Sequence, residues 1–156
     1  MKNMKNKTDN LSLYTLPGHH ARRVHQAAVA LFTEEVGELK LTPVQYAALQ
    51  TICNTPGIDQ TTLAKAIAFD TSTINGVIDR LEARGLLERN ASATDKRVRL
   101  ITPTAQGQEV LKEAIPCVLR SQTRLLAPLT EKERKEYLRL TQLIISAEAG
   151  PDKGSR

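Results

Sequence analysis

The feature that most constrains this fold is a pair of short helices, each with its own start signal, followed at once by two extended segments. Asp59 precedes the helical stretch QTTLAKAIA, and Asp70 precedes a longer one, TSTINGVIDRLEARG, which ends at Gly85. Aspartate caps the free amides of a first helical turn, and glycine accepts the left-handed conformation that ends a helix. A break at Ala68 and Phe69 leaves about three residues between the helices, which is the spacing of a helix-turn-helix.

The periodicity changes from helical to extended after Gly85. The segments LLERN and RVRLIT both have the pattern of strands, and apolar and polar residues alternate more clearly in the second. The segment between them, ASATDK, is polar and contains turn-forming residues. We therefore expect a two-stranded hairpin directly after the second helix, in the position of a wing.

Further helices are expected outside this unit, because apolar residues recur there with helical spacing. Their start signals are Pro17, Thr42, Thr104, and Thr130 with Glu133. Pro116 lies inside the third of these helices and is expected to kink it, since proline lacks the amide of a helix interior. The last helix is expected to bury Tyr137, Leu140, Ile144 and Ala147. Its apolar stripe is wider than one packing partner needs, so a second copy of the chain is an expected neighbour.

The composition excludes several classes of protein. The chain carries 22 Lys and Arg against 17 Asp and Glu, and the resulting net charge of +5 favours an anionic partner only weakly. Two cysteines, Cys53 and Cys117, are too few for a four-thiolate zinc site or a disulfide framework. The start of the chain lacks the apolar core of a secretory signal, and no apolar run is long enough to cross a bilayer. We therefore expect a cytoplasmic protein with no membrane partner.

Motifs of enzymes and metal proteins are missing from the sequence. It contains no nucleophile elbow, phosphate-binding loop, dinucleotide fingerprint or metal-ligand motif. Its three histidines have neither HxxxH nor HExxH spacing, and no cysteine lies near them in the sequence. The expectation is a protein that is not an enzyme and that uses neither a metal nor another cofactor.

The helix at 71–85 has two different faces. Ile74, Val77, Ile78 and Leu81 fall within a narrow arc and are expected to anchor the helix to the domain. The opposite face carries short polar side chains that suit the major groove of DNA, and its candidate contacts are Ser72, Thr73, Asn75, Gly76 and Arg80. Asp79 is expected to pair with a neighbouring arginine or to accept from a cytosine amine. Taken alone, this face is equally typical of a solvated amphipathic helix.

Cationic residues around the helix favour the DNA-binding interpretation. Arg84 ends the helix, and Lys96, Arg97 and Arg99 follow in the hairpin. Arg97 is placed to enter the minor groove, where the negative potential of DNA concentrates. Each charge by itself is typical of a solvated surface. A helix, a turn, a second helix and a basic wing in this order predict double-stranded DNA as the partner.

The run from Ile58 to Gly107 resembles the MarR family of bacterial transcription regulators. The specific marks are VIDRLEARGLLER, the wing signature Asp95-Lys96-Arg97, and Pro103-Thr104 followed by Gly107. The family more often has Leu at the position of Pro103, which affects the joint between wing and helix. The length and order of the flanking helices extend the resemblance to most of the chain.

The resemblance implies a homodimer in which the first helix and the last two helices of each subunit form the dimerisation region. It also implies that Asp95 steadies the wing while Arg97 contacts DNA. A two-fold dimer in turn predicts a nearly palindromic operator. The expected fold is mainly α with a small β-hairpin, a winged helix-turn-helix with an N- and C-terminal helical dimerisation region. The expected division is a flexible tail at 1–10, one domain at 11–148 and a flexible tail at 149–156. Within the domain, the winged helix-turn-helix covers about 42–104, and the dimerisation helices about 15–37 and 104–148.

A small aromatic acid is the expected effector, since most proteins of the resembled family are repressors that such a ligand releases. The candidate ligand-binding residues are His19, Arg22, Arg23 and Tyr46. An arginine and a histidine that converge on a carboxylate form a suitable site for this class of ligand. The same residues are also compatible with a solvated surface or with hydrogen bonds inside a dimer interface.

Two other functions remain open at this point. A regulator of the same fold that senses oxidants through Cys53 or Cys117 requires an exposed thiol with a lowered pKa, whereas both cysteines lie among apolar residues. A winged-helix module that binds proteins is the second alternative, because a fold does not fix its function.

Overall fold

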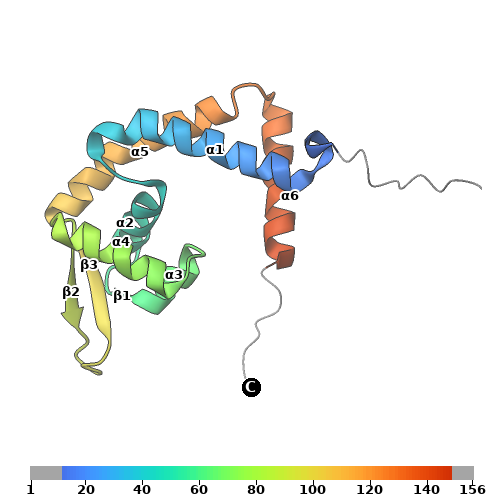
Figure 1. The fold of residues 1–156 in the computed structure, drawn as a ribbon. Coiled ribbons are helices and arrows are strands. Elements are labelled where there is room, and N and C mark those ends of the chain that lie inside the picture. The colour runs from blue at the N-terminus through green and yellow to red at the C-terminus, as the bar shows by residue number, and fades with distance from the viewer. Residues whose placement is uncertain (1–11, 149–156) are drawn as a thin grey trace, which may run out of the picture.

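The computed structural model of the protein describes residues 12–148 (Figure 1). The expected tails at 1–10 and 149–156 lie outside the described residues. The elements follow in the order η1 (Leu13–Thr15), α1 (Pro17–Val36), η2 (Gly37–Leu39), α2 (Pro43–Asn54), β1 (Ile58–Asp59), α3 (Gln60–Ala66), α4 (Thr71–Ala83), β2 (Leu87–Ala91), β3 (Arg99–Pro103), α5 (Ala105–Leu125) and α6 (Glu131–Glu148). The long helices α1 and α5 run side by side above a lobe formed by α2, α3, α4 and the strands.

Capping residues start the helices where the sequence predicts. The amide of Thr62 donates to Oδ1 of Asp59 at 2.9 Å, and the amide of Thr73 donates to Oδ1 of Asp70 at 2.8 Å. A side-chain cap is worth about 1 kcal/mol to a helix. The two caps therefore fix the starts of α3 and α4 and confirm the predicted helix-turn-helix. Ala68, in the turn between them, has a left-handed backbone with φ 56°.

The strands form an antiparallel sheet in the order β1-β3-β2. The predicted hairpin is confirmed, with Arg89 of β2 opposite Ile101 of β3. The sequence reading missed β1, in which Ile58 lies opposite Ile101. This strand has only two residues, so it is too short to show the alternating pattern that identifies a strand.

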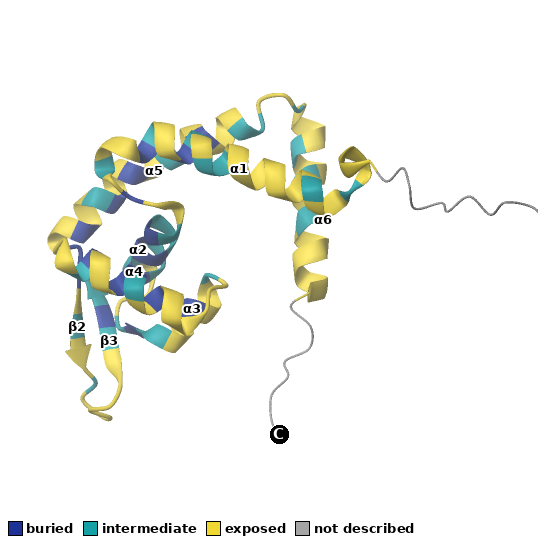
Figure 2. Ribbon diagram, viewed as in Figure 1, coloured by how far each residue is buried: buried dark blue, intermediate teal, exposed yellow. Residues whose placement is uncertain are grey.

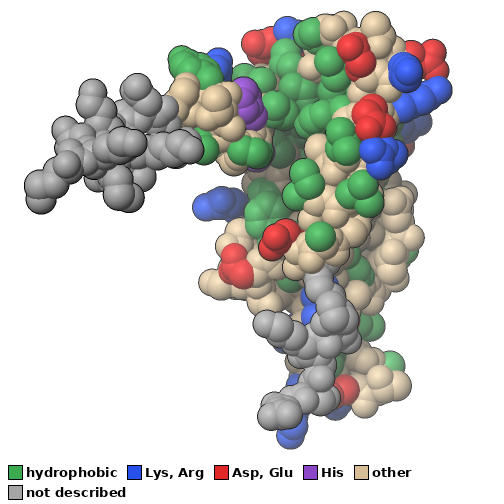
Figure 3. Space-filling model, turned by 90° about the vertical axis from the view of Figure 1, so that its right-hand side faces the viewer, with side chains coloured by type: hydrophobic (Ala, Val, Ile, Leu, Met, Phe, Trp, Pro, Cys, Tyr) green, Lys and Arg blue, Asp and Glu red, His purple; other side chains and the backbone are tan. Residues whose placement is uncertain are grey.

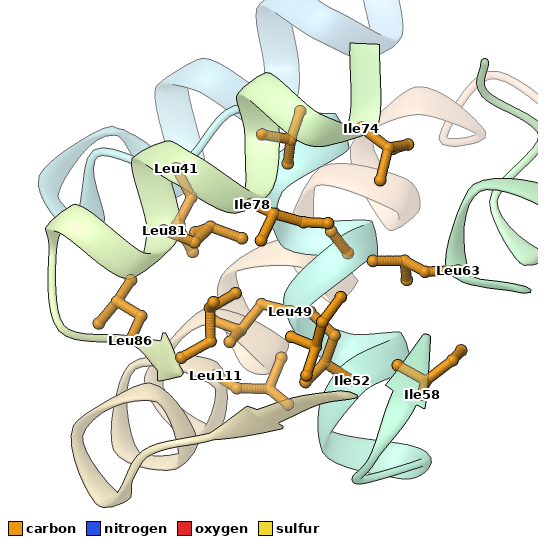
Figure 4. Packing of buried hydrophobic residues seen from close by; sticks show 14 of the residues in the cluster. Leu41, Leu49, Ile52, Ile58, Leu63, Ile74, Ile78, Leu81, Leu86 and Leu111 are labelled. Carbon is orange, nitrogen blue, oxygen red and sulfur yellow. The ribbon is translucent and has the colours of Figure 1, made fainter. Parts of the chain in front are cut away.

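The core lies in the lower lobe, where α4 packs over α2 and α3 (Figures 2 and 4). All four apolar residues expected to anchor α4 are buried, namely Ile74, Val77, Ile78 and Leu81. They pack with side chains of α2, α3, β3 and α5 that include Leu49, Ile52, Leu63, Ile101 and Leu111. This packing leaves the other face of α4 outside the core.

The expectation about the buried residues of α6 is wrong. The described residues of α6 include none that is buried, and Leu140 and Ile144 are 45% and 66% exposed. The reason is that α6 projects from the end of α1 and α5, so that residues 12–148 of the same chain leave its apolar side chains exposed. Pro116, which was expected to kink its helix, lies within α5, and α5 runs as one helix from Ala105 to Leu125.

The joint between β3 and α5 explains Thr104 and Gly107 of the motif that follows the wing. The Thr104 hydroxyl donates to the carbonyl of Gly85 at 2.6 Å and accepts from the amide of Gly107 at 3.0 Å. The Thr104 amide donates to the carbonyl of Leu86 at 3.1 Å. A methyl group on Gly107 would overlap that same carbonyl. The motif therefore locks the start of α5 onto the segment that connects α4 to the wing.

Candidate nucleic-acid interface and effector region

The outer face of α4 is exposed along the length of the helix. Ser72, Thr73, Asn75 and Arg80 are exposed and Gly76 is half-exposed. The Thr73 hydroxyl already donates to Oδ2 of Asp70 at 2.6 Å as part of the helix cap. Space around Gly76 is open, since a methyl group there would meet nothing within 4 Å. This face therefore offers short polar groups and a backbone that another molecule can approach closely.

The wing carries exposed cations on a turn that Asp95 organises. Oδ1 of Asp95 accepts from the Arg97 amide at 2.9 Å, and its carbonyl accepts from the Val98 amide at 3.0 Å. Lys96, Arg97 and Arg99 are exposed. The resemblance implied a wing-stabilising role for Asp95, and these two hydrogen bonds give that role a physical basis.

A groove separates the wing from the starts of α3 and α4. Its volume is about 490 Å³, and it is lined by Asp59, Gln60, Thr61, Thr71, Arg97, Val98 and Arg99. The amide group of Gln60 donates to the carbonyl of Thr71 at 3.2 Å, which ties the two helix starts together. The groove therefore combines the N-terminal ends of two helices with two guanidinium groups, and both features attract phosphate oxygens.

Arg84 lies apart from this surface. Its Nη1 donates to the carbonyl of Lys40 at 2.8 Å, and its Nη2 donates to the carbonyl of Leu39 at 2.9 Å. The sequence placed Arg84 among the DNA contacts because it ends the predicted recognition helix. Its two hydrogen bonds instead attach the end of α4 to the connection between α1 and α2, so we leave it out of the proposed contacts.

The expected pairing of Asp79 with an arginine is present. Nη2 of Arg89 donates to Oδ1 of Asp79 at 2.7 Å and to Oε2 of Glu82 at 2.6 Å. These hydrogen bonds raise the pKa of Arg89, with Glu82 as the larger cause. The part played by Glu82 was missed, because its position on the helix gives no sign of which strand residue faces it.

The histidine and arginine cluster at the start of α1 is divided between two environments. Nη2 of Arg22 lies 3.3 Å from Nδ1 of His19, and Nε2 of His20 lies 2.6 Å from the carbonyl oxygen of Tyr14. Desolvation and the neighbouring Arg22 and Arg23 lower the pKa of His19. This lowered pKa favours the neutral form of His19.

Arg23 lines a pocket between α1, α5 and α6. This pocket has a volume of about 450 Å³, and its other lining residues are His20, Val24, Ala27, Leu125, Leu126, Pro128, Leu129 and Tyr137. Tyr46 does not line it; this side chain lies on α2 with its ring 6.0 Å from that of Phe32. Within one chain, the four predicted ligand-binding residues therefore do not meet in a single pocket. His20 and Tyr137, which were not among the predicted ligand-binding residues, are brought to the pocket by α1 and α6.

The two cysteines have different surroundings. Burial raises the pKa of the Cys53 thiol, which keeps it protonated and a weak nucleophile. Cys117 is half-buried on α5, with its Sγ 3.2 Å from Nη2 of Arg120. The expectation that both thiols lie in apolar surroundings is therefore met more closely by Cys53 than by Cys117.

Among residues 12–148, no group of three or more His, Cys, Asp or Glu side chains is arranged to hold a metal ion. No helix in the same range is long and apolar enough to span a membrane.

The fold and the exposed face of α4 define a winged helix-turn-helix protein. The model of the MarR family matches residues 41–98. The transcriptional regulator HosA of Escherichia coli is 32% identical over 128 residues, which are 82% of this chain and 93% of HosA. This chain therefore belongs to the MarR family of transcriptional regulators.

Solved structures agree with this assignment. The PcaV transcriptional regulator of Streptomyces coelicolor, in complex with its natural ligand, matches with a TM-score of 0.84 at 34% identity, over 89% of this chain and 98% of PcaV. BpsR of Bordetella bronchiseptica, whose DNA binding is regulated by 6-hydroxynicotinic acid, matches with a TM-score of 0.83 at 28% identity, over 92% of this chain and 99% of BpsR. Both similarities extend well beyond the helix-turn-helix.

Proposed function

We propose that this protein is a cytoplasmic repressor that binds a nearly palindromic operator as a homodimer and is released by a small aromatic acid. The observation that carries the proposal is the exposed polar face of α4 beside the cationic wing. Asn75 and Arg80 would face base edges, and Arg97 would meet the adjoining backbone or the minor groove. The proposed contacts are Ser72, Thr73, Asn75, Gly76, Arg80, Lys96, Arg97 and Arg99.

The exposed side of α6 supports the homodimer. Figure 3 views the side of the molecule that carries α6, where many hydrophobic side chains are exposed. The exposed apolar residues of α6 are Leu138, Leu140, Leu143, Ile144 and Ile145, between 45% and 66% exposed. Large apolar side chains that are exposed together on one helix favour an interface. Since a two-fold dimer presents two equal recognition helices, it favours an operator with two equal half-sites.

The proposed effector is supported by the charge of α1 and by one relative. Arg23 lines the pocket between α1, α5 and α6, and Arg22 precedes it on α1, with its Nη2 3.3 Å from Nδ1 of His19. A guanidinium binds a carboxylate through two parallel hydrogen bonds, while apolar side chains accept an aromatic ring. The relative BpsR responds to a ligand of this class.

Binding to DNA is tested by a gel shift with the DNA upstream of the protein's own gene, at two salt concentrations and with competitor DNA. Specific binding is expected to survive the competitor and to weaken steeply with salt, because bound phosphates release counterions. The variant R97A is expected to weaken binding to all sequences, and its log–log salt slope is expected to fall by about 1. A gel shift that is weak and equal for all DNA sequences would instead favour a protein-interaction module.

The dimer is tested by light scattering on the full chain and on the double variant L143E/I144E. The parent is expected to have the mass of two chains and the variant the mass of one. Operator affinity is expected to fall by roughly a hundredfold in the variant, because its two half-sites no longer bind together. A parent with the mass of one chain at the concentration that retards DNA would contradict the proposal.

The effector is tested by a thermal-shift screen of hydroxybenzoates, cinnamates and hydroxynicotinates. A ligand that binds the folded state raises the melting temperature. The variants R22A and R23A are then measured separately, to identify which guanidinium binds the carboxylate. No shift with any compound would remove the aromatic acid from the proposal and leave the DNA-binding part unchanged.

A further inference from the structure

Three side chains form a continuous hydrogen-bond network from the exposed face of α4 to the wing. Nδ2 of Asn75 donates to Oδ2 of Asp79 at 3.4 Å, and the other oxygen of Asp79 accepts from Nη2 of Arg89 at 2.7 Å. Arg89 belongs to β2 and is held in turn by Glu82, whose Oε2 accepts from Nε at 3.0 Å and whose Oε1 accepts from the backbone amide at 3.3 Å. Asn75 is therefore connected to the wing through two ion-paired side chains.

These contacts among Asn75, Asp79 and Arg89 define the orientation of the Asn75 amide. An ionised carboxylate only accepts hydrogen bonds, so the NH₂ group of Asn75 has to face Asp79. Oδ1 and the second N–H of Asn75 are then left for a partner outside the protein. Arg89, whose side chain is only 25% exposed, holds Asp79 in place. The amide thus presents one acceptor and one donor in a defined direction before any partner binds.

The charges argue against a simple role in attracting DNA. Asp79 and Glu82 contribute two carboxylates against the single guanidinium of Arg89, so the network as a whole is anionic. An anionic group on a surface that meets phosphates lowers affinity for every sequence. Attraction of phosphates therefore does not account for the network, whereas its geometry defines the direction of the Asn75 amide.

We propose that Asp79 and Arg89 are positioning residues that hold Asn75 ready to read one adenine in each half-site. Adenine presents the N7 acceptor and the N6 donor in the major groove, and asparagine matches this pair with two hydrogen bonds. No other base pair offers the same pattern in the same place. This inference rests on the proposed function, since it assumes that α4 enters the major groove.

The experiment selects binding sites from a library of randomised duplex DNA, with the full-length parent and the variants N75A, D79A and N75A/D79A. The parent is expected to prefer adenine by roughly tenfold or more at one position of each half-site. That preference is expected to disappear in N75A and to fall to about twofold in D79A. In N75A/D79A, the second substitution is expected to add nothing to the effect of N75A alone, because Asp79 acts through Asn75.

The matched control is E88A. Glu88 is also an exposed carboxylate of the wing, but its Oε1 contacts Asn90 and Thr102 at 3.4 Å and takes no part in the network. Its loss is expected to leave the adenine preference unchanged. A further variant, D79N, keeps the shape of the side chain and is expected to give an intermediate preference, since its amide has an acceptor for Asn75 but no charge for Arg89. Melting curves of all variants verify that they are folded.

The outcomes separate this inference from the proposed function. If D79A binds every sequence more tightly and keeps the full preference for adenine, Asp79 is only a repulsive charge and the inference is overturned. The same holds if N75A keeps the preference. If the parent itself selects no sequence, the proposed function fails and the inference fails with it.

Discussion

Arg84, at the end of α4, donates a hydrogen bond to the carbonyl oxygen of Lys40, 2.8 Å away in the connection between α1 and α2. A second hydrogen bond reaches the carbonyl of Leu39 at 2.9 Å. The C-terminal end of the candidate recognition helix is thereby attached to the segment that follows α1. A sequence reading takes the same arginine for a DNA contact, so the two roles have to be separated by measurement.

The variant R84A is expected to lose about 1 kcal/mol of unfolding free energy, because two hydrogen bonds from an exposed cation are removed. Urea unfolding measures this loss. The matched control is R80A, one turn earlier, whose side chain has no hydrogen bond among the described residues. R80A is expected to keep its stability within about 0.5 kcal/mol but to bind operator DNA more weakly. Equal stability of the two variants would show that the Arg84 contacts contribute nothing.

Gly107 is expected to tolerate no side chain. In G107A the methyl group would overlap the Leu86 carbonyl, so the helix start has to shift and stability is expected to fall by about 1–3 kcal/mol. Gly18 provides the control, because it is also helical and a methyl group there meets nothing within 4 Å. G18A is expected to be stabilised by about 0.5–1 kcal/mol. Chemical unfolding of the two variants is expected to give effects of opposite sign.

Gly76 separates stability from DNA binding at a single position. A methyl group there meets nothing within 4 Å in the free protein, and alanine favours the helix by about 0.5–1 kcal/mol. G76A is therefore expected to melt at a higher temperature. Its affinity for operator DNA is expected to fall, because the added methyl group keeps the helix backbone away from the groove. Unchanged affinity in a gel shift would mean that this part of α4 does not approach DNA closely.

Glu35 is expected to make stability depend on pH in the acidic range. Its carboxylate accepts from Nε of Arg120 and from Nη1 of Arg124, both at 2.9 Å, and these hydrogen bonds lower its pKa below the ordinary 4.5. A carboxyl whose pKa is lowered by folding stabilises the protein above its unfolded pKa and loses this effect as the pH falls through the folded pKa.

The variant E35Q is therefore expected to be less stable than the parent at pH 7, and this difference is expected to shrink steadily below about pH 4.5. Melting temperatures of both proteins between pH 7 and pH 3 measure the difference. A difference that stays constant over this range would show that ionised Glu35 adds nothing to the contact between α1 and α5.

Local signals account for what was predicted correctly about the fold. Asp59 and Asp70 satisfy amides within three residues of themselves, so their effect on α3 and α4 does not depend on the rest of the chain. The apolar arc from Ile74 to Leu81 follows from helical geometry alone. The charge of Asp79 predicted an arginine as its partner but did not show which arginine. The register of the hairpin brings Arg89 to this position.

The sequence by itself determined where the helices begin, which face of α4 is buried and that a hairpin follows, because caps, periodicity and turns act over a few neighbouring residues. Tertiary structure alone decided that Arg84 donates to the carbonyls of Leu39 and Lys40, that Arg89 is shared between Asp79 and Glu82, and that Tyr46 and Arg23 lie apart. Such contacts join residues that are distant in the chain, so they depend on how whole elements pack. The exposure of the apolar side chains of α6 has the same cause, since none of the other described elements covers them.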